Sequence, residues 1–390
     1  MAQIYKLDKQ TMRKNNVRLI FETIYKQRDR DITRAQLAAQ TKMSAMNVGR
    51  IVDQLLDQGL VVEHGDTDSG APGRPAKRLA LSRSNILALG VSLDVWGASI
   101  GLVDPYGKII AVENHAFDVT ALTPEAALQK TGGIILEFMK EQDIYADRIG
   151  VVMPGLVDPK KGHVRLSSQL CWRDLPVSSL LKKYTGIGEV LLDNDVKARA
   201  LAESRCGSAC NYNNSVLMVI GSGIGAGVII NGSIYRGKDN MAGEIGHIAI
   251  NTNTKLCECG QIGCLQATVT EPAILQEART IRPDIDMNGF MALYKEGEAW
   301  ARRLMDMACG TIVMTINLLA NTFASEAIIL CGSLIDNYPA VRGLIDEAYA
   351  IRQPGFLNTN FDLCYSSFNS DGNVIGAASI ALQSFIRQLA

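Results

Sequence analysis

The sequence predicts an α/β protein that consists of an N-terminal winged helix-turn-helix and a body of two α/β lobes. The chain of 390 residues is longer than one hydrophobic core normally supports. Apolar residues recur at helical spacing before residue 60. From residue 86 onward, short apolar runs alternate with helical segments, which is typical of sheets covered by helices.

We place the head at residues 1–83, a smaller lobe at 84–193 and a larger lobe at 194–373. The C-terminal helix 374–390 is expected to complete the smaller lobe, and the larger lobe is expected to carry a dimerisation surface. The net charge of -1 is unevenly divided, because residues 1–83 hold 15 Lys and Arg against 9 Asp and Glu. A basic head on an acidic body predicts a polyanionic partner for the head alone.

The composition indicates a cytoplasmic protein that does not span a membrane. Nine cysteines, most of them isolated in apolar surroundings, favour a reducing compartment over a disulfide framework. The first residues lack the charged and then apolar profile of a signal peptide. The longest apolar stretch, Val216 to Ile230, is interrupted by four glycines.

Three amphipathic helices and a hairpin predict the head. The second helix begins at a capping box formed by Thr33 and Gln36, and the third begins at Ser44 and ends at Gly59. The runs 60–63 and 78–81 bracket a tip rich in Gly, Asp and Pro, which predicts a β-hairpin wing. The expected inner contacts of the three helices are Val17, Ile20, Phe21, Ile24, Leu37, Ala38, Val48, Ile51, Val52, Leu55 and Leu56.

This pattern predicts a helix-turn-helix whose third helix enters the major groove of DNA, with its first residues at the base edges. Arg74 lies between Gly and Pro, an extended setting that suits the narrow minor groove of A·T-rich DNA. The alternative, a small packing module without a DNA function, stays open. The candidate DNA contacts are Thr33, Ser44, Ala45, Met46, Asn47, Arg50, Arg74 and Lys77.

The body is predicted from alternating strand-like and helical segments. Gly221 to Gly227, a run of alternating glycines, follows one strand and could aim backbone N–H groups at an anion, although tight strand turns need glycine too. We infer no nucleotide binding from it. The expected strands are 86–91, 98–103, 108–112, 148–153, 190–193, 216–220, 228–230 and 327–330, and the expected helices are 124–141, 196–206, 299–320 and 374–389.

A cluster of Cys and His predicts a structural zinc ion, one per chain. His247 precedes Cys257, Cys259 and Cys264, and the glycines between the cysteines permit the sharp turns that let three thiolates converge. Three Cys and one His form a closed tetrahedral set that leaves no position open for catalysis. Buried free thiols are the alternative, and three of nine cysteines within eight residues argue against it.

Several motifs in order resemble the ROK family (repressors, open reading frames and kinases of sugar metabolism), and in particular its N-acetylglucosamine, xylose and glucose-regulon repressor branch. The resemblance covers essentially the whole chain and implies a sugar-kinase-like, actin-like body. The motifs are Gly-Arg-Pro-Ala-Lys at 73–77, Met-Pro-Gly-Leu-Val-Asp at 153–158, Leu-Cys-Trp-Arg-Asp-Leu-Pro at 170–176, Asp-Asn-Asp at 193–195, the glycine run, Ala-Gly-Glu-Ile-Gly-His at 242–247 and the cysteine cluster.

The resemblance implies a carbohydrate effector, a sugar or sugar phosphate, held between the lobes. In ROK kinases the residue that matches Asp195 is the general base. A polyol is recognised by several convergent polar groups, so the set is chemically reasonable. By resemblance the effector-binding residues are Gly155, Asn194, Asp195, Glu244, His247 and Gln266.

The departures from the family pattern predict that no kinase activity remains and that no residue is catalytic. ROK kinases open their first lobe with Asp-x-Gly-Gly-Thr, whose glycines let the backbone approach the ATP phosphates. Gln266 stands where the family usually has Glu, and Gln169 where it often has Asn. An amide can donate as well as accept, so we expect an altered selectivity or affinity for the sugar. The residues at the Asp, Gly, Gly and Thr positions of the kinase motif are Ser92, Asp94, Val95 and Trp96.

The resulting hypothesis is a transcriptional repressor, a homodimer or homotetramer that binds a palindromic operator in double-stranded DNA. Effector binding would change the spacing of the two heads and release the DNA. Three alternatives stay open: an active sugar kinase with an appended DNA-binding head, a repressor controlled by a protein partner, and an activator.

Overall fold

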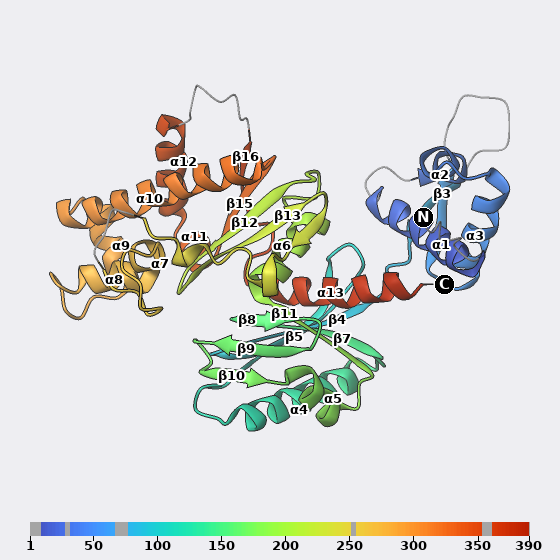
Figure 1. Cartoon of the computed structure of the whole chain (residues 1–390), viewed down its shortest axis with the longest axis horizontal. Helices are drawn as coiled ribbons and strands as arrows, with labels where there is room; N and C mark the ends of the chain where they lie inside the picture. Colours follow the sequence, from blue (N-terminus) through green and yellow to red (C-terminus); the bar gives the residue numbers. More distant parts are fainter. Residues whose placement is uncertain (1–8, 28–31, 67–76, 251–254, 353–360, 390) are drawn as a thin grey trace, which may run out of the picture. The chain divides into compact units, whose positions relative to one another are not determined.

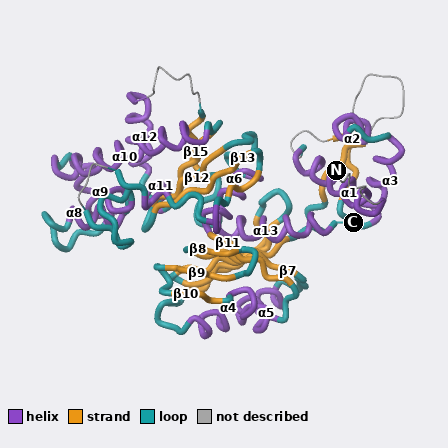
Figure 2. Tube along the Cα trace, in the orientation of Figure 1, coloured by secondary structure: helices purple, strands orange, loops and turns teal. Residues whose placement is uncertain are grey.

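A computed structural model describes residues 9–27, 32–66, 77–250, 255–352 and 361–389. The described chain divides into two compact units. Unit 1 holds residues 1–151, 178–191 and 377–390, and unit 2 holds residues 152–177 and 192–376. The head and the first sheet of the body therefore share a unit. The fold class is confirmed as α/β, with helices and strands mixed along the chain (Figures 1 and 2).

The head contains the predicted three helices and hairpin. Thr33 caps the second helix in a reciprocal capping box with Gln36, and Ser44 accepts from the Asn47 N–H to cap the third. Val17, Ile20, Phe21 and Ile24 are buried, which confirms the first apolar stripe. The elements are α1 (Lys9–Lys26), β1 (Ile32–Thr33), α2 (Arg34–Thr41), α3 (Ala45–Asp57), β2 (Val61–Asp66) and β3 (Lys77–Leu81), with sheet order β1-β3-β2.

The body part of unit 1 is a five-stranded sheet in the order β11-β7-β4-β5-β6. Figure 1 shows α4 and α5 on one face of this sheet and α13 on the other. Gly150 of β7 permits α13 to approach, because a Cβ there would lie 1.8 Å from the Ala377 carbonyl oxygen. The elements are β4 (Ala88–Asp94), β5 (Gly97–Val103), β6 (Ile109–Ala116), α4 (Pro124–Glu141), β7 (Arg148–Met153), α5 (Val177–Thr185), β11 (Glu189–Asn194) and α13 (Gly372–Gln388).

Aromatic contacts within unit 1 join the head to this sheet and to α13. Phe21 of α1 packs edge-on against Phe385 of α13, with ring centroids 6.3 Å apart. Tyr25 of α1 stacks on Tyr106 at 6.5 Å, and the Tyr106 hydroxyl accepts a hydrogen bond of 2.9 Å from the Leu81 N–H at the end of the wing. The head thus packs on the rest of unit 1 through ring contacts and through polar contacts such as the wing hydrogen bond.

Unit 2 contains a small antiparallel sheet, β10-β9-β8, and a mixed five-stranded sheet, β14-β13-β12-β15-β16. Leu217, Ile229 and Ile329 form a small core with Ala200 of α6 on one face of the mixed sheet. The opposite face carries the large core, to which α8, α9, α10 and α12 contribute. The strands are β8 (Leu156–Asp158), β9 (His163–Ser167), β10 (Trp172–Leu175), β12 (Ser215–Ile220), β13 (Ile224–Ile230), β14 (Ser233–Tyr235), β15 (Ala327–Cys331) and β16 (Asp362–Tyr365).

The helices of unit 2 differ widely in length. They are α6 (Asp195–Cys206), α7 (Gln266–Val269), α8 (Glu271–Ala278), α9 (Met287–Glu296), α10 (Ala299–Phe323), α11 (Ser333–Asp336) and α12 (Pro339–Arg352), with 3-10 turns at Lys238–Asn240 and Ile245–His247. By length and composition alone, α10 could cross a membrane. However, 56% of its apolar window is buried inside the protein, as in the core helix of a soluble domain.

The glycine run agrees with the second of the two interpretations above, a tight turn between strands. Ile224 to Gly227 belongs to β13, which pairs antiparallel with β12, and only residues 221–223 form the connecting turn. The Gly221 N–H bonds within this turn to the Gly223 carbonyl oxygen at 2.9 Å. The first part of the run is therefore a tight turn, and the rest is part of a strand that has little side-chain bulk.

Candidate functional site

The polar cluster predicted at residues 194 and 195 lies at the start of α6. Asn194 is the N-cap of this helix, and its side-chain oxygen accepts from the Lys197 N–H at 3.0 Å. Its amide nitrogen donates to the Gly155 carbonyl oxygen at 3.1 Å and to an Asp195 carboxylate oxygen at 3.0 Å. One amide thus fixes three of the expected features: the Pro-Gly turn, the helix start and the Asp195 carboxylate.

Gly155 is required at its position by both space and backbone conformation. Its φ is +115°, and a Cβ there would lie 2.5 Å from the Leu166 carbonyl oxygen. A side chain would push the turn away from β9, and the carbonyl that receives Asn194 would move with it. The Pro-Gly turn is thus a fixed support for the cluster.

An ion pair between the buried Asp193 and the half-buried Arg236 adjoins the cluster, and sequence reasoning missed it. Asp193 and Arg236 are joined by hydrogen bonds of 2.9 and 2.6 Å. Asn240 accepts from the same guanidinium at 3.0 Å and donates to the Val157 carbonyl oxygen at 3.0 Å. Asp193 is consequently neutralised by its own partner.

Glu244 follows a backbone turn that only glycine can form. Gly243 has a φ of +92°, and a Cβ there would lie 1.8 Å from the Ala226 carbonyl oxygen. Its own carbonyl accepts from the Ala226 N–H at 2.8 Å and from the Ile245 N–H at 2.7 Å. The side chain of Glu244 is partly exposed, and its Oε1 lies 3.9 Å from Nζ of Lys197. Lys197 connects Glu244 to the cluster at the start of α6.

The remaining expected effector residues lie near this turn. Gly246 leaves room for Gln266, whose Oε1 would lie 3.1 Å from a Cβ at that glycine. His247 ends the 3-10 turn and is exposed. Gln169 lies beside Gly223, with its Nε2 3.6 Å from the place of a Cβ there. Hydrogen bonds thus connect Gly155, Asn194 and Asp195, and Lys197 connects this group to Glu244. Gln266 and His247 are connected to Glu244 only through the backbone turn.

His247, Cys257, Cys259 and Cys264 come together as a possible metal site. Their ligand atoms all lie within 4.8 Å of one another. Cys257 Sγ lies 3.8 Å from His247 Nδ1, and Cys259 Sγ lies 3.6 Å from Cys264 Sγ. Tetrahedral zinc with Zn–S bonds of about 2.3 Å holds sulfurs about 3.8 Å apart. The donor set and its spacing therefore fit such an ion.

The loop that carries the cysteines is a narrow hairpin. Leu256 bridges to Ile262, and the Cys257 N–H donates to the Gln261 carbonyl oxygen at 2.8 Å. Gly260 and Gly263 have φ of +87° and +85°, so the two predicted sharp turns use left-handed backbone. Burial, with the neighbouring thiols Cys259 and Cys257, raises the pKa of Cys264 to about 12. A bound cation would be needed to hold that sulfur as a thiolate.

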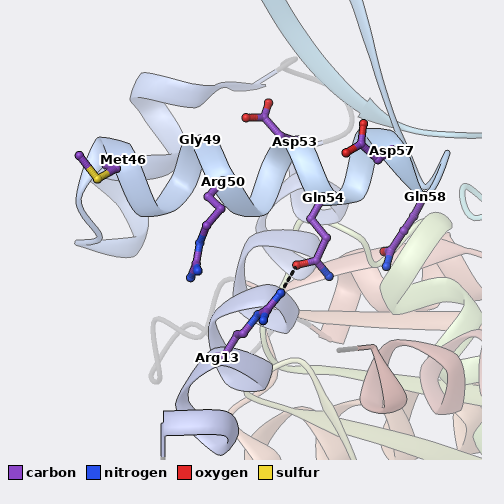
Figure 3. Close-up of a pocket in the computed structure, with 8 residues that line it drawn as sticks. All are labelled: Arg13, Met46, Gly49, Arg50, Asp53, Gln54, Asp57 and Gln58. Atoms are coloured by element: carbon purple, nitrogen blue, oxygen red, sulfur yellow. Dashed lines mark hydrogen bonds between the residues drawn. The ribbon is translucent and has the colours of Figure 1, made fainter.

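The first residues of α3 lie on the surface of the head. Ser44, Ala45, Met46 and Arg50 are exposed and Asn47 is half-buried. A groove of about 680 Å³ is lined by Arg13 of α1 and by residues along α3 and its C-cap, Asp53 and Asp57 included. In Figure 3, Arg50, Gln54 and Gln58 point to the side of α3 where Arg13 lies, and Asp53 and Asp57 point the other way. Within the groove, Arg13 of α1 donates to Gln54 at 3.0 Å.

The other three expected DNA contacts do not belong to α3. Thr33 is 8% exposed and its hydroxyl caps α2, so we assign it a structural role. Lys77 opens β3, with its ammonium 3.2 Å from Glu63. Arg74 lies outside the described residues. On the other side of α3, Arg34 pairs with Asp53 at 2.7 Å and with Glu63 at 2.9 Å, which neutralises acidic charge beside that helix.

The segment that we aligned with the kinase phosphate motif is a closed hairpin turn between β4 and β5. The Asp94 carboxylate accepts from the Trp96 N–H at 2.7 Å, so this backbone donor is already used. Burial raises the pKa of Asp94, and the N–H groups of Trp96 and Gly97 act in the opposite direction. Trp96 is 80% exposed and Ser92 is buried. The Asp94 carboxylate thus closes this turn on itself.

Comparisons with known proteins agree with this architecture. A model of the ROK family matches residues 89–384. The chain is 28% identical over 382 residues to a xylose repressor of Bacillus spizizenii, which covers 97% of this chain and 98% of the relative. It is 28% identical over 319 residues to a glucokinase of Thermotoga maritima, which covers 75% of this chain and 96% of the relative.

A solved structure has the same fold over nearly the whole length. It is the crystal structure of a ROK family transcriptional regulator described as a homolog of the E. coli MLC protein. The TM-score is 0.80 at 22% sequence identity, over 97% of this chain and 98% of that chain. At 22% sequence identity, this likeness is evidence for the fold alone.

Proposed function

The chain belongs to the ROK family, and we propose that it is a DNA-binding transcriptional repressor of carbohydrate metabolism genes, controlled by a sugar bound at the α6 cluster. The observation that carries this proposal is the extent of the match. The xylose repressor covers 97% of the chain, including the basic head, whereas the glucokinase covers 75% and the family model begins only at residue 89.

The head supplies the DNA contact. Ser44, Ala45, Met46, Asn47 and Arg50 begin an exposed, capped helix, and the N-terminal residues of a recognition helix meet base edges in the major groove. Lys77 and Arg74 of the wing region add positive charge for the backbone and the minor groove. A homodimer or homotetramer places two such heads on a palindromic operator.

A sugar bound at the candidate effector site would control DNA binding. Asn194, Asp195 and Glu244 present amide and carboxylate groups that suit hydroxyl groups, and Gly155, His247 and Gln266 complete the expected set. A coupling of about 1 to 3 kcal/mol between sugar and operator would weaken DNA binding 5- to 150-fold.

A structural zinc ion holds the loop that carries His247. His247, Cys257, Cys259 and Cys264 would form a closed site that fixes this loop and supplies no catalytic position. Because His247 ends the turn that starts at Glu244, the ion would connect loop order to effector binding.

We propose that the chain is not an enzyme and acts in the cytoplasm. The Asp94 carboxylate occupies the backbone donor that a phosphate would need. The kinase alternative is favoured by the glucokinase relative, so it is tested directly by ATP consumption with a panel of pentoses and hexoses. Turnover above the buffer rate would support that alternative.

The test of the main proposal is operator capture. Chromatin precipitation with the full chain should enrich promoters of carbohydrate genes, and the purified protein should bind the enriched duplex with an affinity that falls steeply as salt rises. One sugar of the panel should release it. Equal binding to every duplex, or no binding to any, would contradict the proposal.

A further inference from the structure

Met46 is a large apolar side chain that lies outside the core of the head. It is 87% exposed, whereas Val48 and Ile51 of the same helix are almost completely buried. Single exposed apolar residues are common on protein surfaces, so exposure alone assigns no role to Met46. Its role has to be inferred from its neighbours on α3 and from the charge around it.

Gly49, three residues after Met46, is a glycine that the fold of the head does not require. Among the described residues, nothing lies within 4 Å of the position that its Cβ would take, and its φ is outside the left-handed region. Alanine would therefore fit, and it would stabilise the helix, because glycine inside a helix loses more backbone freedom on folding. Residues three apart share a helix face, so Gly49 leaves free space beside Met46.

Met46 and Gly49 line the same groove as Arg50, which lies one turn beyond Met46. The charge along α3 favours a polyanion at this part of the helix. Arg50 attracts phosphates, whereas Asp53 and Asp57 in the second half of α3 repel them and point away from the side of Arg50 (Figure 3). A duplex should thus come closest to α3 at its first two turns, where Met46 and Gly49 lie.

The chemistry of Met46 favours one base over the other three. In the major groove guanine, cytosine and adenine present polar atoms, and only thymine adds an apolar group, its C5-methyl. An unbranched thioether side chain adapts its shape to such a group, and it offers no hydrogen bond that would select a polar base edge. The absence of a Cβ at Gly49 allows the duplex to approach the helix closely enough for this contact.

We propose that Met46 is a specificity-determining residue that contacts the C5-methyl group of a thymine in each operator half-site, and that Gly49 admits the duplex to it. This inference rests on the proposed function and deepens it, because it names the base that this part of α3 recognises.

The experiment replaces each thymine of the captured operator in turn with deoxyuridine, which pairs in the same way and lacks only the methyl group. One position in the half-site should weaken binding of the full chain roughly 4-fold, the value expected for one buried methyl group. Met46→Ala should bind the unmodified operator more weakly by a similar factor and should be insensitive to deoxyuridine at that position. Met307→Ala, which removes a half-exposed methionine of α10, should keep the sensitivity of the parent protein.

A second pair of variants tests Gly49 without risk to the fold. Gly133 of α4 also has no described neighbour within 4 Å of its Cβ position, so it is the matched control. Gly49→Ala and Gly133→Ala should both be at least as stable as the parent protein in urea unfolding. Only Gly49→Ala should weaken operator binding, roughly 5-fold or more, because the new methyl group overpacks the contact with DNA. A glycine with a purely structural role would not combine retained stability with lost affinity.

The inference is overturned if no thymine position is sensitive, if the sensitive position remains so in Met46→Ala, or if Gly49→Ala binds the operator normally. A changed oligomeric state in Met46→Ala, with unchanged operator affinity, would make Met46 a protein contact and would also overturn it. If the parent protein binds no duplex at all, the proposed function fails instead.

Discussion

A methyl group at Gly243 should destroy effector control while leaving the rest of the protein folded. In Gly243→Ala, the new Cβ would lie 1.8 Å from the Ala226 carbonyl oxygen, where an ordinary contact needs about 3.5 Å. The turn must open by roughly 1.5 Å, and Glu244, the next residue, moves with it. The φ of +92° adds backbone strain that an L side chain does not relieve.

The magnitude follows from these two terms. Backbone strain costs roughly 1–2 kcal/mol and overpacking roughly 1–3 kcal/mol, so Gly243→Ala should lose about 2–5 kcal/mol of unfolding free energy. Gly232→Ala is the matched control. Gly232 has a φ of +70° in the turn between β13 and β14, and nothing lies within 4 Å of its Cβ position. Gly232→Ala should therefore lose only the part of the unfolding free energy that is due to backbone strain, roughly 1–2 kcal/mol.

Urea unfolding of the three proteins measures both losses, provided that the m-value is unchanged. Calorimetry with the effector sugar then shows whether the displaced Glu244 still binds, and we expect a loss of affinity of 10-fold or more in Gly243→Ala alone. Equal unfolding free energies for the two variants, together with normal sugar binding by both, would refute the assignment of Gly243 as the support of Glu244.

Three further predictions address the metal, the DNA and the junction with the head. In metal analysis, Cys264→Ser should lower bound zinc from one ion per chain to near none. Cys309 is another buried thiol, and Cys309→Ser should retain the zinc. Zinc retained by both variants would contradict the proposed metal site. Arg50→Ala should weaken operator binding by about 1–3 kcal/mol, while Arg303→Ala on the exposed side of α10 should leave it unchanged. An equal loss of affinity in both variants would argue against α3 as the helix that contacts the bases. Tyr106→Phe removes the acceptor of the Leu81 N–H and should cost about 1–3 kcal/mol of stability, against no change in Tyr145→Phe, which is 89% exposed.

Local signals in the sequence predicted the elements of the head and the convergence of His247 with three cysteines. The capping box of Thr33 and Gln36, the N-cap at Ser44 and the first apolar stripe all involve residues a few positions apart, so one sequence reveals them. The cysteines lie within eight residues, and only His247, ten residues before Cys257, had to be added to them. Such signals need no knowledge of how distant segments meet.

The contacts that hold the candidate effector site in place could not be predicted from nearby residues in the sequence. Asn194 bonds to Gly155, 39 residues away, and Asp193 pairs with Arg236, 43 residues away. Nothing in the residues around Lys197 marks it as buried, because a charged residue near a helix start is usually solvated. Its burial depends on how α6 packs on β13, which is a property of the tertiary structure.

The glycine run explains this packing. Gly225 lies against Val196, and a Cβ at Gly227 would lie 2.3 Å from the Ala200 Cβ and 3.0 Å from the Val196 carbonyl oxygen. Side chains on β13 would therefore push α6 away from the sheet and expose Lys197, which lies between these two contacts on the helix. The same glycines that could be mistaken for an anion loop thus bring α6 close enough to β13 to bury an ammonium beside Glu244. The position of Lys197 beside Glu244 therefore depends on Gly225 and Gly227, which are not among the expected effector residues.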